Sequence, residues 1–343
     1  MTISVKCVTD ARQSAWNEYV ASHPQGSFYH RYEWRGFFED YFGKQCLYLA
    51  AEDGSGIVGV VPIVRQCSRL FGDYMVSLPF VNYGGILADS GDAEAALVSE
   101  AEVLAKRSEV SHVEFRGLSP VSGLPVKTNK VAMQLQLPKD QEELAKRLGA
   151  KLRSQIRRPQ REKPVVRAGG QELLDSFYAV FSRNMRDLGT PVYAKSMFRD
   201  LLGRFPDSAG IVTVQLRGHP VAAGFLFHHE GRSEVPWASS DRRYNRLGVN
   251  MLLYWEMLKE SMRRGSDVFD FGRSSRDAGT YRFKKQWGAE PVQLHWSYWL
   301  KEKSEMPELN PENSRFALAI RTWQRLPVWA TRMLGPALAQ NLP

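Results

Sequence analysis

The chain has 343 residues, of which 43% are hydrophobic and 24% are charged, and its formal net charge is +9. This composition excludes a disordered or fibrous protein, and the length suits two domains of ordinary size. The three cysteines (Cys7, Cys46 and Cys67) are odd in number and lack metal-type spacing, so we expect no disulfide framework, metal or bound cofactor. With no signal-peptide pattern and no run of about 18 apolar residues, we expect a cytoplasmic protein.

Hydrophobic patterns along the chain predict an α/β protein with mixed sheets. In both halves a strand hairpin is followed by a helix and then by a strand that ends in glycine. The two copies align at offsets of 164 and 155 residues, which favours a duplicated domain over chance similarity. The expected elements are strands at 47–51, 57–64 and 112–116 and a helix at 93–107, then strands at 211–216, 221–228, 234–238 and 267–271 and a helix at 249–263.

The basic residues suggest where the domains divide. Residues 146–167 contain nine Lys or Arg and one acid, and residues 314–343 contain four Arg and no acid, so each segment predicts an anionic partner. We expect a helix over 141–158 that Pro159 stops, and a second helix over 171–188 that Gly189 closes. The expected division is a first domain, a basic connecting helix, a second domain and a C-terminal tail (1–145, 146–167, 168–303 and 304–343).

Five stretches of sequence resemble one known family. They are SFYHRYEW near the N-terminus, then KLRSQIRRPQREKPVVRAGG, RGHPVAAGFLFHH, SSDRRYNRLGVNMLLYWEMLKE and FDFGRSSRDAGTYRFKKQWGAE. In this order they resemble the FemAB-like N-acyltransferases of the GNAT superfamily, most closely the branch that accompanies exosortase and exopolysaccharide systems. The resemblance covers about residues 5–300 and is sharpest at 267–288.

The resemblance implies two tandem GNAT-like domains and a reaction in which an amine of a cell-envelope precursor attacks an activated acyl carbonyl. In the best-known relatives the donor is aminoacyl-tRNA and the acceptor is a peptidoglycan precursor, whereas other branches of the superfamily use acyl-CoA. The acceptor expected here is a nucleotide- or lipid-linked glycan or peptide. Two alternatives stay open: a degenerate, non-catalytic GNAT pair that serves as a scaffold, and an acyl-CoA-dependent N-acetyltransferase.

Acyl transfer to an amine requires stabilisation of an oxyanion and removal of a proton from the amine. By its place in the family motif YRFKK, Lys284 is the first catalytic candidate and Tyr281 is a further one, and the alternative is a solvated basic helix end. Asp241 is a candidate base, although an Asp before a helix is more often a cap. Asp270 alternates with two phenylalanines and needs a partner such as Arg273 or Lys284 if it is buried.

Other candidates concern substrate binding. Arg153 and Arg157 lie one helical turn apart and, with Arg158, form a candidate clamp for tRNA phosphates or a nucleotide-linked precursor, the alternative being a solvated linker helix. Trp34 and Arg35 occupy the entry motif of the first domain. Relatives that act on nucleotide-linked peptidoglycan precursors have a lysine soon after this tryptophan, so Arg35 leaves the acceptor open.

The donor is suggested by a loop that departs from a known pattern. GNAT enzymes that use CoA hold its pyrophosphate with a Q/R-x-x-G-x-G/A loop at a helix N-terminus. Residues 245–250 (NRLGVN) keep only the central Gly248 of that pattern. This departure favours an aminoacyl-tRNA donor over acyl-CoA.

The C-terminal segment reads as a basic amphipathic helix that is kinked at Pro327. Such a helix either lies on an anionic membrane surface or docks its apolar stripe on the second domain, and the sequence leaves both alternatives open. The first alternative implies a peripheral location at the inner face of the membrane.

Overall fold

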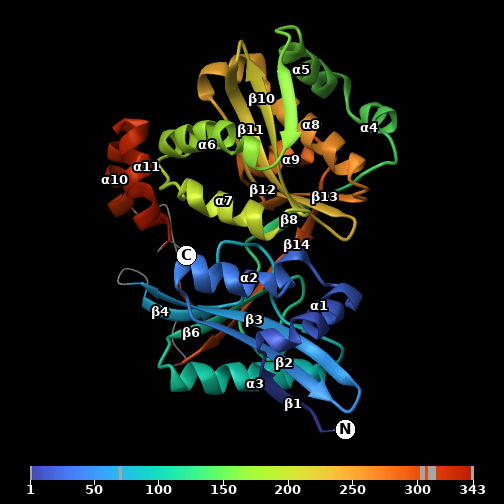
Figure 1. Cartoon of the computed structure of the whole chain (residues 1–343), viewed down its shortest axis with the longest axis vertical. Coiled ribbons are helices and arrows are strands. Elements are labelled where there is room, and N and C mark those ends of the chain that lie inside the picture. Colours follow the sequence, from blue (N-terminus) through green and yellow to red (C-terminus); the bar gives the residue numbers. More distant parts are fainter. Residues whose placement is uncertain (1, 69–71, 302–305, 308–313, 341–343) are drawn as a thin grey trace.

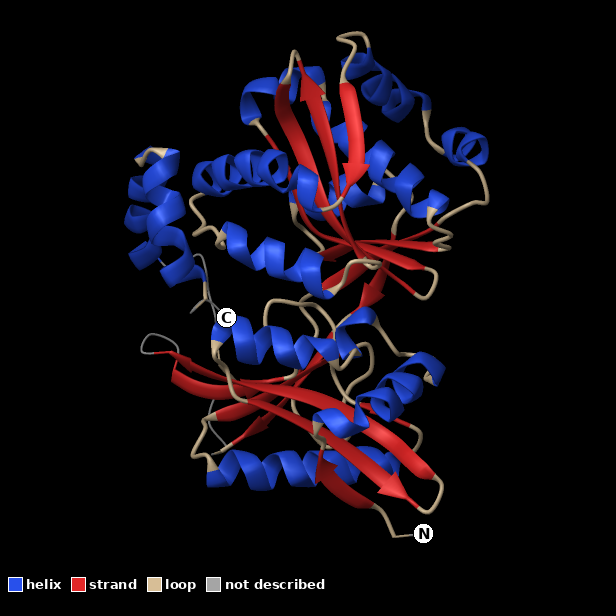
Figure 2. Cartoon of the chain, in the orientation of Figure 1, coloured by secondary structure: helices blue, strands red, loops and turns tan. Residues whose placement is uncertain are grey.

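A computed structural model describes residues 2–68, 72–301, 306–307 and 314–340. Two α/β halves, each built on one mixed sheet, are stacked along the long axis of the molecule (Figures 1 and 2). The predicted mixed α/β class is therefore confirmed. Within the described ranges, no helix combines the length and the apolar character required to cross a bilayer.

The first sheet belongs mainly to the N-terminal half. Helix α3 (Gly91–Arg107) covers one face through a stripe of small and apolar residues, while α1 (Gln13–Ser22) and the short α2 (Glu33–Gly36) lie over the other. The strands follow in the spatial order β1 (Ser4–Cys7), β2 (Cys46–Asp53), β3 (Gly56–Ser68), β4 (Gly72–Val76), β6 (His112–Gly117), β15 (His295–Leu300) and β7 (Val126–Lys127), and β5 (Leu87–Ala88) pairs with β3.

The second sheet lies between two layers of helices. Alternate residues of its strands face α6 (Leu174–Leu188) and α7 (Lys195–Arg204) on one side, and α8 (Val249–Arg263) and α5 (Ala150–Gln160) on the other. Its spatial order is β14 (Glu290–Gln293), β8 (Val131–Gln136), β13 (Val268–Ser274), β12 (Arg232–Ser240), β11 (His219–His229), β10 (Ala209–Leu216) and β9 (Val165–Gly169).

The two sheets have the same topology. In each, three antiparallel strands are followed by a helix and by a strand that pairs in parallel, β4 with β6 and β12 with β13. Beyond this parallel strand, each sheet continues with a strand from the other half of the chain. In the first sheet β15 pairs with β6, and in the second sheet β8 pairs with β13. The two sheets therefore do not follow the linear division expected at 1–145 and 168–303, because β8 and β15 each pair with strands of the other half.

The basic segment is folded against the second sheet. Instead of one helix over 141–158, the chain forms α4 (Gln141–Arg147) and α5, which are separated at Gly149. Pro159 lies inside α5, and the helix ends one residue after it, at Gln160. Leu152 and Ile156 are buried against α8, and β9 adds an edge strand to the sheet.

The C-terminal residues form two helices beside α6, namely α10 (Ser314–Arg325) and α11 (Val328–Ala339), with Pro327 between them (Figure 1). The helical pattern of the sequence puts Phe316 and Ile320 on the apolar stripe of this segment, and the side chain of Phe316 lies outside the described residues. Ile320 contacts Gly189 at the end of α6, so docking on the second domain occurs. Gly189 has φ +79° and caps α6 as predicted.

Candidate active site

The candidate site lies where two parallel strands separate. β12 and β13 are paired only between Arg232–Glu234 and Val268–Asp270, although both strands continue. A cavity of about 440 Å³ occupies the gap beyond these residues. Its lining includes Trp237 from β12, Arg273 just past the paired part of β13, and Lys284 from α9 (Gly279–Lys285).

Lys284 is held inside this gap. Its side chain is buried, and its Nζ donates hydrogen bonds of 2.9 Å to the carbonyl oxygens of Gly272 and Arg273. Burial lowers the pKa of Lys284 to about 8, although Asp270 and Glu234 oppose this shift. Because an ammonium has three N–H donors, two carbonyl contacts leave one donor for a ligand in the cavity.

A bulge in β13 presents these carbonyls. The pairing of β13 with β8 shifts register between Asp270 and Arg273. At the bulge Gly272 has φ +75°, a left-handed conformation that favours glycine. Its N–H donates to Asp270 Oδ1 at 2.7 Å while its carbonyl accepts from Lys284, so one glycine positions both groups.

Two carboxyl groups lie beside Lys284. Asp270 is buried and accepts hydrogen bonds from the Tyr83 hydroxyl and from Gln134 Nε2, the latter at 3.1 Å. Glu234 accepts from Asn82 Nδ2 at 3.2 Å. Burial raises the pKa of both carboxyls, and that of Glu234 is raised further by Asp270. The pair therefore retains a proton at a pH where an exposed carboxyl has lost it.

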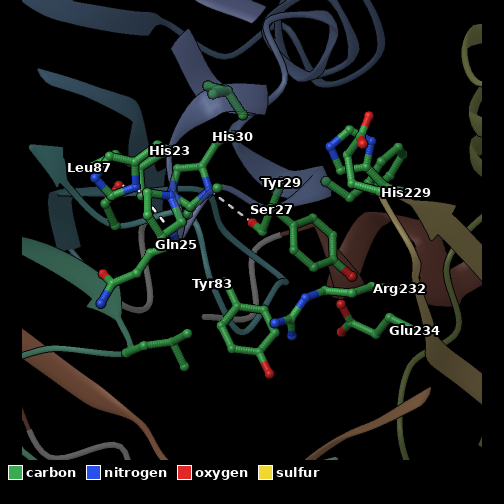
Figure 3. Close-up of a pocket in the computed structure, with 18 of the residues that line it drawn as sticks. His23, Gln25, Ser27, Tyr29, His30, Tyr83, Leu87, His229, Arg232 and Glu234 are labelled. Atoms are coloured by element: carbon green, nitrogen blue, oxygen red, sulfur yellow. Dashed lines mark hydrogen bonds between the residues drawn. The ribbon is translucent and has the colours of Figure 1, made fainter. Parts of the chain in front are cut away.

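A second cavity reaches the same pair from the opposite side. It has a volume of about 340 Å³ and lies between the two halves, and Tyr29, Tyr83, Glu234 and Asp270 all line it. In Figure 3 the Tyr29 hydroxyl points toward the Glu234 carboxylate, and burial together with this carboxylate raises the Tyr29 pKa. Glu234 therefore lines both cavities, whereas Asp270 lines only the second.

His30 is a structural member of the second cavity. Its Nε2–H donates to the Gly85 carbonyl at 3.1 Å, so Nδ1 accepts from the Ser27 hydroxyl at 2.8 Å. Burial lowers the pKa of His30 to about 3, which keeps the imidazole neutral at physiological pH.

Two arginines share one aromatic ring next to the gap. The guanidinium carbons of Arg116 and Arg273 lie 4.5 and 5.3 Å from the Trp296 ring centroid. Arg116 is neutralised by Glu114, with Nε 2.6 Å from Oε1, whereas no ion pair holds Arg273 within the described residues. Arg273 is open to the cavity but surrounded by protein, and this desolvation, with Arg116 nearby, lowers its pKa to about 10. An anionic ligand would compensate this charge.

Asp241 and Tyr281 lie outside the gap. Asp241 caps a short 3-10 helix (Arg242–Leu247), accepting from Arg243 N at 3.0 Å, and forms an ion pair with Arg243 at 2.6 Å. Burial opposes ionisation, but the hydrogen bonds from Arg243 outweigh it and lower the pKa of Asp241. Tyr281 lies on α9 with Lys284 and packs against the core of the second sheet.

The three arginines of the proposed clamp separate into two environments. Arg153 turns back and donates to the carbonyl oxygens of Leu148 at 2.6 Å and Ala145 at 3.3 Å. It therefore covers the C-terminal end of α4. Arg157 and Arg158 are exposed on α5.

Trp34 and Arg35 occupy the core and rim of the first half. Trp34 is 2% exposed, donates to the Phe28 carbonyl at 3.0 Å and packs on Phe205 across the two halves. Arg35 pairs with Glu39 at 2.9 Å. Neither residue lines the two cavities described above.

Sequence patterns did not point to Glu234, Tyr29, Asn82 or Tyr83. Glu234 lies in the predicted strand 234–238, where one acid in a half-buried strand is unremarkable. Asn82 and Tyr83 lie in the loop of the first half between β4 and β5. These residues meet only because the fold brings together segments that are far apart in the sequence, and no local pattern predicts such contacts.

Comparison with known proteins relates one part of the chain to a domain family and most of the chain to known folds. A family model described as an acetyltransferase (GNAT) domain matches residues 146–285. Two solved structures are similar to this protein over most of its length. The structure of FemX has a TM-score of 0.65 and 14% sequence identity, and the match covers 85% of this chain and 96% of FemX. The structure of L-PGS from Bacillus licheniformis has a TM-score of 0.58 and 12% identity, and the match covers 96% of this chain and 98% of L-PGS. The protein is an acyltransferase that contains a GNAT domain, and its fold resembles that of the FemAB-like tandem GNAT proteins.

A further structure similar to this acyltransferase is a tandem GNAT protein from the clavulanic acid biosynthesis pathway (TM-score 0.54, 10% identity, 89% of this chain and 100% of that one). No curated protein matches the chain by sequence. In the part of the acyltransferase that the structure describes, no group of three or more His, Cys, Asp or Glu is arranged to hold a metal ion.

Proposed function

We propose that this acyltransferase transfers an aminoacyl group from aminoacyl-tRNA to a primary amine of a cell-envelope or exopolysaccharide precursor. The observation that carries the proposal is Lys284, a buried cation with one free donor beside a carboxyl pair that shares a proton. Acyl transfer to an amine needs a cation at the developing oxyanion and a base for the amine proton. Lys284 and Glu234 line the cavity between β12 and β13, and Asp270 lines the neighbouring second cavity.

The chemistry follows from this arrangement. The amine nitrogen attacks the ester carbonyl, a C–N bond forms, and the C–O bond to the tRNA ribose breaks. Lys284 stabilises the oxyanion and gives a proton to the leaving ribose oxygen. The ionised member of the Glu234–Asp270 pair accepts the proton that the amine loses, and that proton then restores Lys284. Atoms and protons balance without a metal or redox partner.

The position of α5 supports a polyanionic donor. Gly248 precedes α8 in a left-handed conformation, and a β-carbon placed on it would lie 3.3 Å from the Gln155 carbonyl oxygen of α5. The exposed Arg157 and Arg158 are therefore near the loop that holds phosphates in GNAT enzymes. Contacts from arginine to phosphate predict that donor binding weakens steeply as salt rises.

The resemblance to the FemAB-like family and the similarity to L-PGS bear on the acceptor. Both favour an amine or headgroup presented at the cell envelope over a small soluble amine. Arg273, a cation without an ion pair at the cavity wall, suits the phosphate of a nucleotide- or lipid-linked precursor.

An acyl-CoA donor is the second candidate, because Gly248 keeps the central glycine of the CoA loop at the start of α8. A thermal-unfolding titration with acetyl-CoA and with charged tRNA at low salt separates the two donors. A ligand at about 100 times its Kd stabilises the native state by roughly 2.7 kcal/mol. We expect this shift with charged tRNA, and a saturable shift with acetyl-CoA alone would replace the tRNA proposal.

A further inference from the structure

Exposed apolar side chains gather on the C-terminal helices. Among the described residues, the large hydrophobic side chains that are exposed number eight, and five of them lie on α10 and α11. They are Leu318 (74%), Trp329 (67%), Met333 (68%), Leu334 (47%) and Leu338 (45%). We call these five residues the C-terminal apolar surface. Exposed apolar residues concentrated in this way mark an interaction site more often than scattered ones do.

Helix α11 has one buried face and one exposed face. Ala330, Gly335 and Ala339 are buried toward the body of the second half, and a β-carbon on Gly335 would lie 2.8 Å from the backbone nitrogen of Val192. Trp329 and Met333 follow each other at a spacing of four residues on the opposite face. The small-residue face of α11 therefore packs on the protein, while Trp329 and Met333 are left exposed.

The charged side chains of the C-terminal segment itself are all positive. Residues 314–343 contain no Asp or Glu, and Arg321 and Arg325 are exposed and make no ion pair within the described residues. Arg332 is different, because its Nε donates to Ser182 Oγ at 2.8 Å and its guanidinium lies over the Tyr178 ring. Two arginines thus remain available to a partner.

We propose that the C-terminal apolar surface docks in the interface of an anionic lipid bilayer. Exposed Trp, Met and Leu side chains provide the area that enters the interface, and Arg321 and Arg325 provide attraction to anionic headgroups. Charge complementarity selects lipid over a second copy of this chain, since a second copy would bring the same arginines together.

This docking would orient the reaction cavity. Ala339, on the buried face of α11, lines the cavity that contains Lys284 and Arg273. A membrane held against the outer face of α11 would place a lipid-linked acceptor close to the mouth of that cavity. This orientation rests on the proposed function, whereas binding to lipid does not.

Co-sedimentation with vesicles tests the docking without any acyl donor. The full chain is mixed with vesicles of phosphatidylcholine alone or with about 30% phosphatidylglycerol, a content in the range that gives a strong negative surface potential. We expect binding to the anionic vesicles that weakens with salt. The double variant Trp329→Glu/Met333→Glu should bind at least roughly tenfold more weakly.

The matched control is Val103→Glu/Val165→Glu, which changes two residues of 54% and 56% exposure on α3 and β9. This control should bind anionic vesicles as the wild type does. Arg321→Ala should weaken binding by roughly fivefold. The proposal is overturned if the wild type ignores anionic vesicles, if both double variants bind equally, or if Trp329→Glu/Met333→Glu only converts a dimer into a monomer.

Discussion

Lys284 and Lys285 are neighbours in the sequence but have opposite environments. Lys284 is 7% exposed and bonded to two backbone carbonyls, whereas Lys285 is half exposed and pairs with Glu290 at the surface. Burial lowers the pKa of Lys284, because its ammonium loses hydration. The sequence alone does not distinguish these two lysines, but their burial does. Lys284 is a candidate catalytic group, and Lys285 belongs to a surface ion pair.

The pKa of Lys284 predicts an alkaline limit to activity. The proposed mechanism needs the ammonium form, and the pKa is about 8, so the rate of acyl transfer should fall as pH rises through about 8. Lys284→Arg keeps a cation to much higher pH and should remove this limit from whatever activity it retains. A pH–rate profile measures both, and a wild-type rate that is constant to pH 10 would contradict the role of the ammonium.

The carboxyl pair predicts an effect on stability. Its pKa values are raised in the folded state, so between the unfolded pKa of about 4 and the folded values the native protein binds more protons. The free energy of unfolding therefore falls as pH rises through this window. Glu234→Gln removes one of the two titrating groups and should leave the protein more stable than wild type at pH 8, with no such gain near pH 4.

Urea unfolding at several pH values measures this effect. Glu290→Gln is the matched control, because Glu290 is exposed and pairs only at the surface. Its pH dependence should follow that of the wild type. Equal stability of wild type and Glu234→Gln at pH 8 would show that Glu234 carries its charge without penalty.

At the scale of elements, helix α11 packs closely on the backbone of Val192 through Gly335. A β-carbon on Gly335 would lie 2.8 Å from both the nitrogen and the oxygen of Val192, which cannot move without the backbone. Gly335→Ala should therefore destabilise the protein by about 1–3 kcal/mol, the usual cost of overpacking.

Gly203 on α7 provides the control for that substitution. Nothing lies within 4 Å of a β-carbon at this position, so Gly203→Ala should stabilise the protein by roughly 0.5–1 kcal/mol through its helix propensity. Thermal unfolding compares the two variants. Similar effects of both substitutions would mean that α11 does not pack on residue 192 as described.

Local elements were predictable because their patterns are local. The helix at 249–263 and its neighbouring strands follow from periodicity and glycine positions, and α8 has the predicted bounds. The helix over 141–158 was wrong at Gly149 and Pro159, where one glycine divides it and the proline fits the last turn. Asp270 could be predicted as a buried acid because it alternates with two phenylalanines in its strand. Its partner Glu234 has no such flanking pattern and was not predicted.

At the scale of the whole molecule, the exchange of strands binds the halves together. β8 precedes the expected boundary yet completes the second sheet, and β15 belongs to the expected second domain yet completes the first sheet. Phe28 and Phe227 also stack across the halves with ring centroids 4.5 Å apart. No hydrophobic pattern reveals which sheet a strand joins, because both sheets offer an equivalent position.

This exchange predicts cooperative unfolding. Neither half retains a complete sheet when the other unfolds, so calorimetry of the full chain should show one transition whose calorimetric and van't Hoff enthalpies agree. Two resolved transitions would show that the halves are independent domains despite the shared strands.

The most direct test of the central claim compares two adjacent lysines. Wild type, Lys284→Met and Lys285→Met are incubated with labelled aminoacyl-tRNA and with lipid- and nucleotide-linked envelope precursors, and transfer of label to the precursors is measured. Loss of one oxyanion donor costs about 10²–10³ in kcat. We predict this loss for Lys284→Met, with the same stability as wild type or higher, and a near wild-type rate for Lys285→Met. Equal rates for all three proteins would contradict the account.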